Sequence, residues 1–399
     1  MQTRRNFIGN VATSLAGTLA TGSVLAASDR IRVGIVGVGD RGTQLAREAA
    51  ACPNAELVAF ADVYTRRLEE ALHLAPHART YSDARRLLED PAVDAVIVAT
   101  PQHLHAEAFI AAMDARKPVY IEKAMAFTVD HAKQMRAAWE HAGKPVVQVG
   151  HQACSSGHVA DASNYLASGS LGQITSIRAH FYRNTPHGKP QWYRPAYPDM
   201  TPETVAWKSF LGGAPDRDFD AHRFVNWRYF WDYGGGNVHE NMSQQLAFWY
   251  KVMNLEIPRS VTMTGGIYRW KDGREVPDTM SVSMDHNEDF LFTWNSAFGN
   301  NQPGIGEEIL GAEGTIARGQ QIRYLPQKVT RPDGVEIMGQ TPTAPRAHMQ
   351  DFFDSIRTSR QPACPFETGF RVSVACHLAA ESYLQARTVY WDPKREEIL

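Results

Sequence analysis

A glycine loop that directly follows an apolar strand is the feature that most constrains this chain. Residues 31–36 form a short β-branched run, which predicts a buried parallel strand. The loop Gly37-Val38-Gly39-Asp40-Arg41-Gly42 comes next. Gly37 permits the tight turn, Gly39 lets backbone N–H groups approach a pyrophosphate, and Gly42 lets the following helix pack on the strand. The pattern predicts a Rossmann fold that binds a dinucleotide, with Asp40 and Arg41 in the phosphate loop.

An acidic residue follows the second predicted strand. The apolar run 57–61 ends in Asp62, which lies 20 positions after Gly42. This is the usual offset for a carboxylate that binds the adenosine ribose diol, and it would repel a 2′-phosphate. We therefore expect NAD as the cofactor. Arg66 and Arg67, just beyond, keep NADP as the alternative.

The third predicted strand, 94–99, leads into the loop Thr100-Pro101-Gln102-His103-Leu104-His105. Doubly wound sheets bind ligands at the carboxyl ends of their strands, so we expect Thr100, Pro101, His103 and His105 beside the cofactor. A metal site at the two histidines would need a carboxylate or cysteine cluster, and the sequence offers none nearby. We expect no metal, and we expect His105 to orient the loop.

The length and charge of the chain narrow the classes of function. With 399 residues the chain exceeds the size of one ordinary hydrophobic core, so two domains are expected. Lys and Arg number 41 against 43 Asp and Glu, which lacks the positive excess that nucleic-acid binding needs. The N-terminus combines Arg4-Arg5, a weakly apolar stretch and small residues near 27. This order predicts a twin-arginine export signal over 1–27, a periplasmic or otherwise exported protein, and no stable membrane anchor.

Another strand, 117–121, ends in Glu122-Lys123. With the glycine loop and the 100–105 loop, these residues resemble the glucose-fructose oxidoreductase and inositol dehydrogenase (Gfo/Idh/MocA) family over nearly the whole mature chain. The resemblance implies that Glu122 lies at the cofactor and that Lys123 reaches the nicotinamide and the reacting sugar carbon. The family's Glu-Lys-Pro motif often has a cis bond before its proline. Here Ala124 replaces that proline, and without proline a cis bond is unfavourable and not expected.

The pattern changes after residue 150. A helix at 157–168 precedes expected strands at 174–182, 259–269, 279–286, 289–295 and 314–324. Runs of strands without intervening helices predict an open, mostly antiparallel sheet. We therefore expect an α/β protein with a Rossmann domain over 28–150 and an α+β domain over 151–399. The resemblance gives the second domain the substrate and oligomer contacts, and its open sheet face favours a homo-oligomer.

The helix after the triple glycine at 234–236 resembles the family's catalytic helix, which commonly carries Asp-x-x-x-His. Glu240 takes the acid position and Gln244 takes the histidine position, and glutamine cannot titrate. His239 or Lys123 is then the candidate proton carrier, although His239 projects roughly 100° away from Glu240 on a helix. Catalytic candidates are Lys123, His239, Glu240 and Gln244. Substrate candidates are His151, Gln152, Tyr182, Trp231 and Tyr233, with a buried aromatic core as the alternative for the last two.

The resemblance implies hydride transfer on a carbon of a sugar or glycoside, which is the carbohydrate substrate we expect. An exported enzyme would need a tightly bound NAD that is recycled in place. The first alternative is a redox-neutral, NAD-dependent glycosidase or lyase that oxidises, eliminates, adds water and re-reduces. The second is a non-catalytic dinucleotide-binding module, which Ala124 and Gln244 together suggest.

Overall fold

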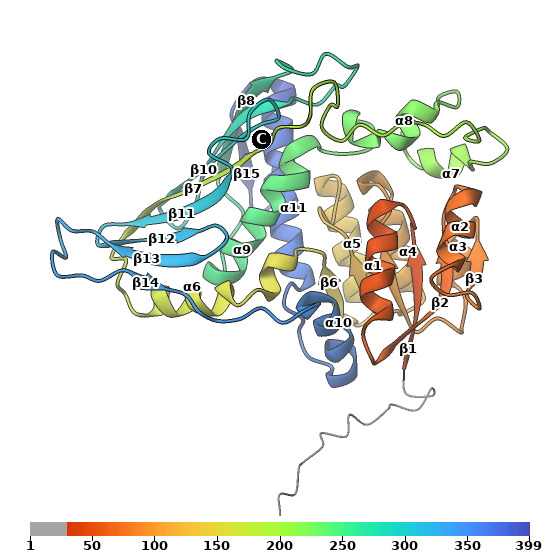
Figure 1. The fold of residues 1–399 in the computed structure, drawn as a ribbon, viewed down its shortest axis with the longest axis horizontal. Helices are drawn as coiled ribbons and strands as arrows, with labels where there is room; N and C mark the ends of the chain where they lie inside the picture. Colours follow the sequence, from red (N-terminus) through yellow and green to blue (C-terminus); the bar gives the residue numbers. More distant parts are fainter. Residues whose placement is uncertain (1–29) are drawn as a thin grey trace, which may run out of the picture.

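The structure is a computed structural model that describes residues 30–399. The predicted export signal at 1–27 lies outside the described residues. The chain forms two regions joined by a long buried helix (Figure 1).

The first region contains a parallel sheet of six strands in the order β3-β2-β1-β4-β5-β6. This order and orientation confirm the predicted Rossmann domain. Its strands are β1 (Ile31–Val36), β2 (Ala55–Ala61), β3 (Arg79–Tyr81), β4 (Ala95–Val98), β5 (Val119–Ile121) and β6 (Val147–Val149). Its helices are α1 (Asp40–Ala50), α2 (Thr65–Leu72), α3 (Ala84–Leu88), η2 (Gln102–Leu104), α4 (His105–Asp114) and α5 (Val129–His141).

The second region is a ten-stranded sheet in the order β14-β13-β12-β11-β7-β10-β9-β8-β15-β16. All its pairs are antiparallel except β7 with β10, so the mostly antiparallel expectation is confirmed. Its strands are β7 (Ile174–Tyr182), β8 (Ser260–Gly266), β9 (Thr279–Asp285), β10 (Leu291–Ala297), β11 (Ile305–Gly311), β12 (Gly314–Arg318), β13 (Ile322–Pro326), β14 (Ile337–Met338), β15 (Val389–Asp392) and β16 (Glu397–Ile398).

Helices α6 (His158–Ala167), α9 (Ser243–Met253) and α11 (Phe366–Gln385) lie along one side of this sheet (Figure 1). The other helices of this part of the chain are η3 (Gln152–Ser155), α7 (Trp207–Leu211), α8 (Ala221–Val225), η4 (Trp227–Tyr229), η5 (Val238–Met242) and α10 (Ala347–Thr358).

Two strand predictions need correction. The single strand expected at 314–324 is the hairpin β12–β13, which turns at residues 319–321. Gly319 and two glutamines interrupt the β-branched pattern there, and this is a normal turn composition. Strand β11 was missed because its sequence contains two glycines and two glutamates, residues that are depleted in strands.

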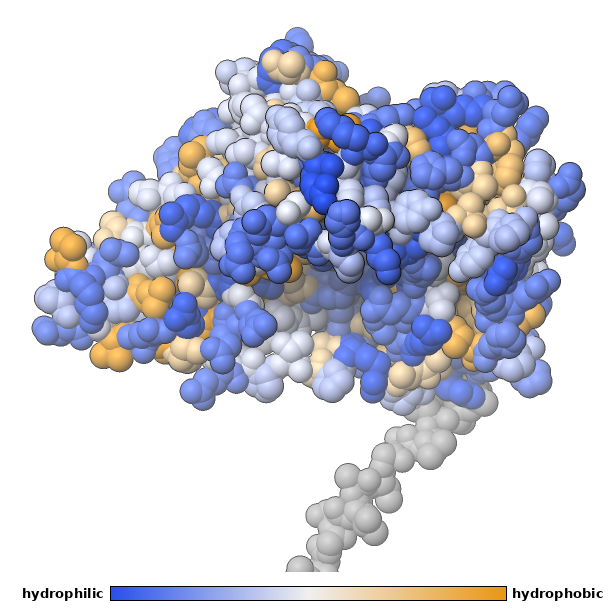
Figure 2. Space-filling model, turned by 45° about the horizontal axis from the view of Figure 1, so that its top comes forward, coloured by the Kyte–Doolittle hydropathy of each residue, from blue (hydrophilic) through white to orange (hydrophobic). Residues whose placement is uncertain are grey.

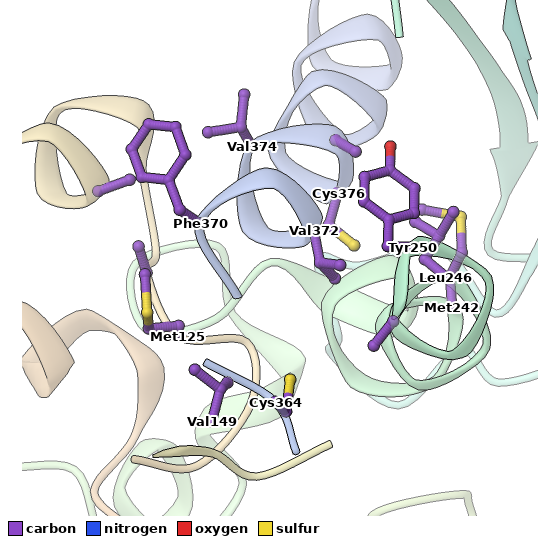
Figure 3. Close-up of a cluster of buried hydrophobic side chains, with 14 of the residues drawn as sticks. Met125, Val149, Met242, Leu246, Tyr250, Cys364, Phe370, Val372, Val374 and Cys376 are labelled. Atoms are coloured by element: carbon purple, nitrogen blue, oxygen red, sulfur yellow. The ribbon is translucent and has the colours of Figure 1, made fainter. Parts of the chain in front are cut away.

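The C-terminal helices return to the Rossmann domain. Met349, Phe352 and Phe353 of α10 belong to the apolar cluster that fills one side of the first sheet. Helix α11 begins beside β6, where the Val149 N–H donates to the Cys364 carbonyl at 2.9 Å. Figure 3 shows side chains from β6, α9 and α11 in one buried cluster. The continuous packing fixes the two regions against each other and so defines the cleft between them.

The space-filling view shows a mostly hydrophilic surface with a hollow near the middle of that face (Figure 2).

Within residues 30–399, none of the helices has the length and apolar character needed to cross a membrane. Among residues 30–399, no group of three or more His, Cys, Asp or Glu side chains is arranged to hold a metal ion.

Candidate active site

A pocket of about 920 Å³ lies between the two regions, and both contribute to its walls. The carboxyl ends of β1, β2, β4 and β5 open into it, as expected for a doubly wound sheet. The second region contributes the segment 191–228 and the helical segment 240–244. The volume is typical of a ligand-binding cleft.

The three glycines of the phosphate loop have different surroundings. Gly37 has a φ of +86°, and a Cβ there would lie 2.9 Å from the backbone of Ala99 and Thr100. A Cβ on Gly42 would lie 1.8 Å from the Gly37 carbonyl oxygen. A Cβ on Gly39 would meet only the flexible end of Arg67, at 3.4 Å. Gly37 and Gly42 are therefore required by the fold itself, whereas Gly39 keeps the pocket side of the loop open.

Asp62 closes the same end of the pocket at the tip of β2. One carboxylate oxygen accepts the Val38 N–H at 2.8 Å and the other accepts the Tyr64 N–H at 3.0 Å. The side chain is buried and lines the pocket. A carboxylate has about four acceptor positions, so two remain for hydroxyl groups of a ligand. The Arg67 guanidinium lies 3.8 Å away.

Lys123 reaches from the end of β5 across the cleft to the second region. Its Nζ donates to the Glu240 carbonyl oxygen at 2.8 Å and to the Glu240 carboxylate at 2.9 Å. The peptide bond from Lys123 to Ala124 is cis, contrary to the expectation drawn from the absence of proline. The Ala124 carbonyl oxygen lies 2.9 Å from the Nδ1 atom of His105.

Glu240 sits among three donors. Its carboxylate contacts Lys123, accepts the Gln102 Nε2–H at 2.9 Å and lies 3.2 Å from Arg228 Nε. Burial alone would raise the pKa of Glu240, but the charges of Arg228 and Lys123 outweigh it and lower the pKa to about 2. Glu240 is therefore a fixed negative charge in the cleft.

A chain of hydrogen bonds joins Gln244 to the phosphate-loop side of the cleft. Gln244 donates to Gln152 Oε1 at 3.3 Å, and Gln152 donates to the Tyr120 hydroxyl at 2.9 Å. Glu122 accepts the Arg41 Nε–H at 2.8 Å. Gln152, Gln244 and Glu122 all line the pocket. Amides thus occupy the position where the family commonly has a titratable histidine.

His239 and His151 are excluded from the pocket wall, although the sequence made both candidates. His239 is completely buried against α11, and burial lowers its pKa to about 3. His151 is equally buried, and neither of its ring nitrogens has a hydrogen-bond partner among residues 30–399. Helical geometry explains the first correction, because His239 points away from the face that carries Glu240.

The two histidines of the 100–105 loop contact backbone carbonyl groups and hold the loop in place. The His103 Nε2 atom lies 2.7 Å from the Phe210 carbonyl oxygen, and its ring packs against Tyr233. The His105 Nε2 atom lies 2.9 Å from the Thr100 carbonyl oxygen. Neither ring lines the pocket, whereas Thr100 and Pro101 do.

The three aromatic substrate candidates also lie outside the pocket wall. Tyr233 is fully buried in an aromatic cluster with Phe210 and Phe230. Trp231 faces a second cavity and packs on Tyr383. Tyr182 does not line the cleft. The alternative of a buried core therefore holds for Tyr233, because its ring is needed to fill the space under the 191–228 segment.

Gln102, Arg183 and Arg228 are among the polar residues that line the cleft and that sequence reasoning missed. Gln102 lies in the 100–105 loop, where only the neighbouring residues were candidates, and Arg228 lies three residues before the candidate Trp231. The sequence did contain a signal for Arg228, because this charged residue stands between the aromatic residues Trp227 and Tyr229. Arg183 follows the last residue of β7, and only the register of the sheet brings it into the cleft.

Residues 31–151 match the family model described as "Oxidoreductase family, NAD-binding Rossmann fold" (GFO_IDH_MocA). The Rossmann domain of the chain belongs to this family. Inositol 2-dehydrogenase of Salmonella typhimurium is 31% identical over 154 residues, which are 38% of this chain and 46% of that enzyme. The chain thus spans about half the length of several of the curated relatives that it matches. The inositol 2-dehydrogenase of Acidothermus cellulolyticus is 26% identical over 366 residues, 89% of this chain and 94% of that enzyme.

A solved levoglucosan dehydrogenase in complex with NADH has the same fold. Its TM-score is 0.71 at 19% identity, and the match covers 90% of this chain and 99% of that one. The fold likeness therefore extends from the Rossmann domain through the second domain, as the Gfo/Idh/MocA resemblance implied.

Proposed function

We propose that this protein is an NAD-dependent oxidoreductase that acts on a carbon of a sugar or glycoside. The observation that carries the proposal is the position of Lys123. Its amino group lies in the cleft that the phosphate loop lines, and Glu240 and Arg228 from the second region surround it. The inositol dehydrogenases and the levoglucosan dehydrogenase to which the chain is similar support a carbohydrate substrate.

The residues of the cleft fit a nicotinamide dinucleotide. Helix α1 begins directly after Gly39 and has no side-chain cap, so the N–H groups of its first turn are available to a pyrophosphate. The Thr100 hydroxyl oxygen is buried in the pocket wall without a hydrogen-bond partner among the described residues, so a bound ligand can satisfy it. The acceptor positions left on Asp62 suit the ribose diol and favour NAD over NADP.

Bound NAD supplies the hydride acceptor, and the chain supplies the remaining groups. Lys123 exchanges the proton of the reacting hydroxyl, because its amino group lines this part of the wall and an amine can act as a general acid or base. Glu240 orients the Lys123 amino group through two hydrogen bonds. Gln152 and Gln244 bind neighbouring hydroxyl groups, since amides both donate and accept.

The N-terminal sequence extends the proposal to the handling of the cofactor. The twin-arginine route carries folded proteins, so an exported form would leave the cytoplasm with NAD already bound. Such a form would retain NAD and recycle it in the cleft. We expect purified protein to contain NAD in stoichiometric amount.

The test uses full-length protein as isolated. Denaturation should release NAD, and addition of free sugars should change the absorbance of the reduced nicotinamide without added cofactor. Release of an aglycone from aryl glycosides with no net change in that absorbance would replace the dehydrogenase by the redox-neutral glycosidase. Absence of any response, together with equal behaviour of the Lys123→Ala variant, would leave a binding module.

A further inference from the structure

The part of the cleft around Lys123 carries more positive than negative charge. Lys123, Arg183 and Arg228 line it together with the carboxylate of Glu240. Glu240 contacts both Lys123 and Arg228, at 2.9 and 3.2 Å. The adjacent Glu122 is already paired with Arg41, at 2.8 Å. Three cations thus share one carboxylate, which leaves an excess of two positive charges.

Arg183 is the cation without a counterion. Its guanidinium has no ion pair and no hydrogen bond with any of residues 30–399. It is nevertheless close enough to Glu240 for that negative charge to act on the pKa of Arg183. Its backbone N–H donates to the Ala297 carbonyl at 3.0 Å, and its guanidinium lies over the Phe181 ring at 4.4 Å. The side chain is therefore half-buried and held in place at the end of β7.

Arg228 also has binding capacity left over. It contacts Glu240 through Nε, and its guanidinium lies over the Trp227 ring at 4.2 Å. Neither of its two terminal nitrogens donates a hydrogen bond to an acceptor in the described part of the chain. A partly buried guanidinium with unused donors is unfavourable, so Arg183, together with the terminal nitrogens of Arg228, favours an anion from the ligand in this cleft.

We propose that the substrate is an acidic carbohydrate whose anionic group binds between Arg183 and Arg228. The group is a carboxylate, as in a uronic acid or its glycoside, or a phosphate ester. The inference deepens the proposed function and rests on it. It also assigns Arg183 as the residue that selects the charged substrate.

The decisive comparison is between neutral and anionic sugars of the same configuration. Full-length protein loaded with NAD is assayed with glucose, glucuronate and glucose 6-phosphate, and with galactose and galacturonate. We expect kcat/KM to be at least about tenfold higher for an anionic member, since charge-assisted hydrogen bonds are the stronger ones. The uronate and phosphate arms identify which anion is bound. The advantage should shrink as NaCl rises from about 50 to about 500 mM.

The Arg183→Gln variant should lose about tenfold to a hundredfold in kcat/KM for the anionic sugar. Arg183→Lys keeps the positive charge but cannot bind an anion through two parallel N–H groups, so its loss in kcat/KM should be smaller. Arg178→Gln is the matched control, because Arg178 lies on the same strand, is exposed and pairs with Glu308 outside the cleft. It should behave as the unmodified protein.

Three results would overturn the inference: equal kcat/KM for neutral and anionic sugars, equal losses on both in Arg183→Gln, or a weaker affinity for NAD in that variant with the anion preference kept. If no sugar reacts, the proposed function fails. Calorimetric binding of glucuronate against glucose to the NAD-loaded protein then still decides the inference, because binding does not require turnover.

Discussion

Two carboxylates of the second region are buried next to arginine, yet their pKa values are shifted in opposite directions. Glu240 faces the cleft and its side chain is 9% exposed, whereas Glu307 lies in the ten-stranded sheet and is 3% exposed. The pKa of Glu240 is lowered to about 2 and that of Glu307 is raised to about 7. Burial raises both, so the difference comes from the partners.

Glu240 has two cations and an amide donor, and every contact is directed at its carboxylate or backbone. Glu307 has one cation, Arg318, which it contacts across β11 and β12, and its second oxygen has no hydrogen-bond partner among residues 30–399. One cation that is itself held over the Phe248 ring does not offset the loss of water. A buried carboxylate stays ionised here only where several donors converge.

The contrast assigns different roles to the two groups. Glu240 remains ionised across the physiological range, so it positions Lys123 but does not transfer a proton. Glu307 could exchange a proton near neutral pH, but it lies outside the cleft wall. The remaining titratable candidate at the reacting end of the pocket is Lys123, which gives the first prediction.

Replacement of Lys123 by glutamine should have the largest effect. We expect kcat to fall by about 10²- to 10⁴-fold, which is the usual contribution of a general acid or base. Affinity for NAD should change little, because the phosphate loop and Asp62 are untouched. Lys144→Gln, at an exposed lysine, is the control. Activity within tenfold of the unmodified protein would contradict the role of Lys123.

The difference between the two carboxylates should appear in the free energy of unfolding. The folded-state pKa of Glu307 lies above the unfolded value of 4.5, so its contribution is present at low pH and is lost as pH rises through about 7. Relative to unmodified protein, Glu307→Gln should therefore become more stable by about 2 kcal/mol between about pH 5.5 and 7.5. The same comparison for Glu240→Gln should stay constant, because Glu240 titrates near pH 2.

Urea denaturation of the three proteins at both pH values measures these differences. Each variant serves as the control for the other, since both remove one buried carboxylate. A pH-dependent gap for Glu240→Gln, or a constant one for Glu307→Gln, would show that the partners do not decide the charge state.

Burial lowers the pKa of a histidine side chain, whereas it raises the pKa of a carboxylate, so the buried histidines should change the free energy of unfolding with pH in the opposite direction. Burial lowers the pKa of His151 and His239 to about 3, and that of His103 and His348 to about 4. The unfolded chain binds these protons near pH 6.5, so stability should fall as pH drops below 6.5. Each should cost about 1 kcal/mol at pH 5.5. Glu307→Gln should show a steeper fall than unmodified protein, because it lacks the opposing contribution of Glu307.

The Rossmann half was largely predictable because local rules determine it. The glycine loop, the acid 20 residues later and the apolar parallel strands each follow from one stretch of sequence. The same holds for the mostly antiparallel second sheet, whose alternating strands are visible in the chain. The hairpin at 319–321 and strand β11 were misjudged because glycine and glutamate there are tolerated only through tertiary pairing.

The candidate site was less predictable because it is assembled from distant segments. Lys123 and Glu240 were found by resemblance, but their mutual contact joins positions 117 residues apart. Arg183 carries no local signal and enters the cleft only through the register of β7. His239 and Tyr233 were chosen for their chemistry, and the direction of their side chains excluded them. Sequence patterns identify elements well, whereas side-chain direction in the long 191–240 segment depends on packing.

Asp62 extends the comparison to a third buried carboxylate, which backbone N–H groups hold rather than side-chain cations. Asp62→Ser should raise the Kd for NAD about threefold to tenfold, because one or two hydrogen bonds to the ribose diol are lost. It should also lower the Kd for NADP, since the repulsion of a 2′-phosphate disappears and Arg67 remains nearby. Arg67→Gln should shift the preference the other way, toward NAD. Fluorescence titration with both cofactors measures the ratio, and an unchanged ratio in Asp62→Ser would mean that the carboxylate supports only the loop. In that case backbone partners alone would account for its burial, just as side-chain cations account for the burial of Glu240.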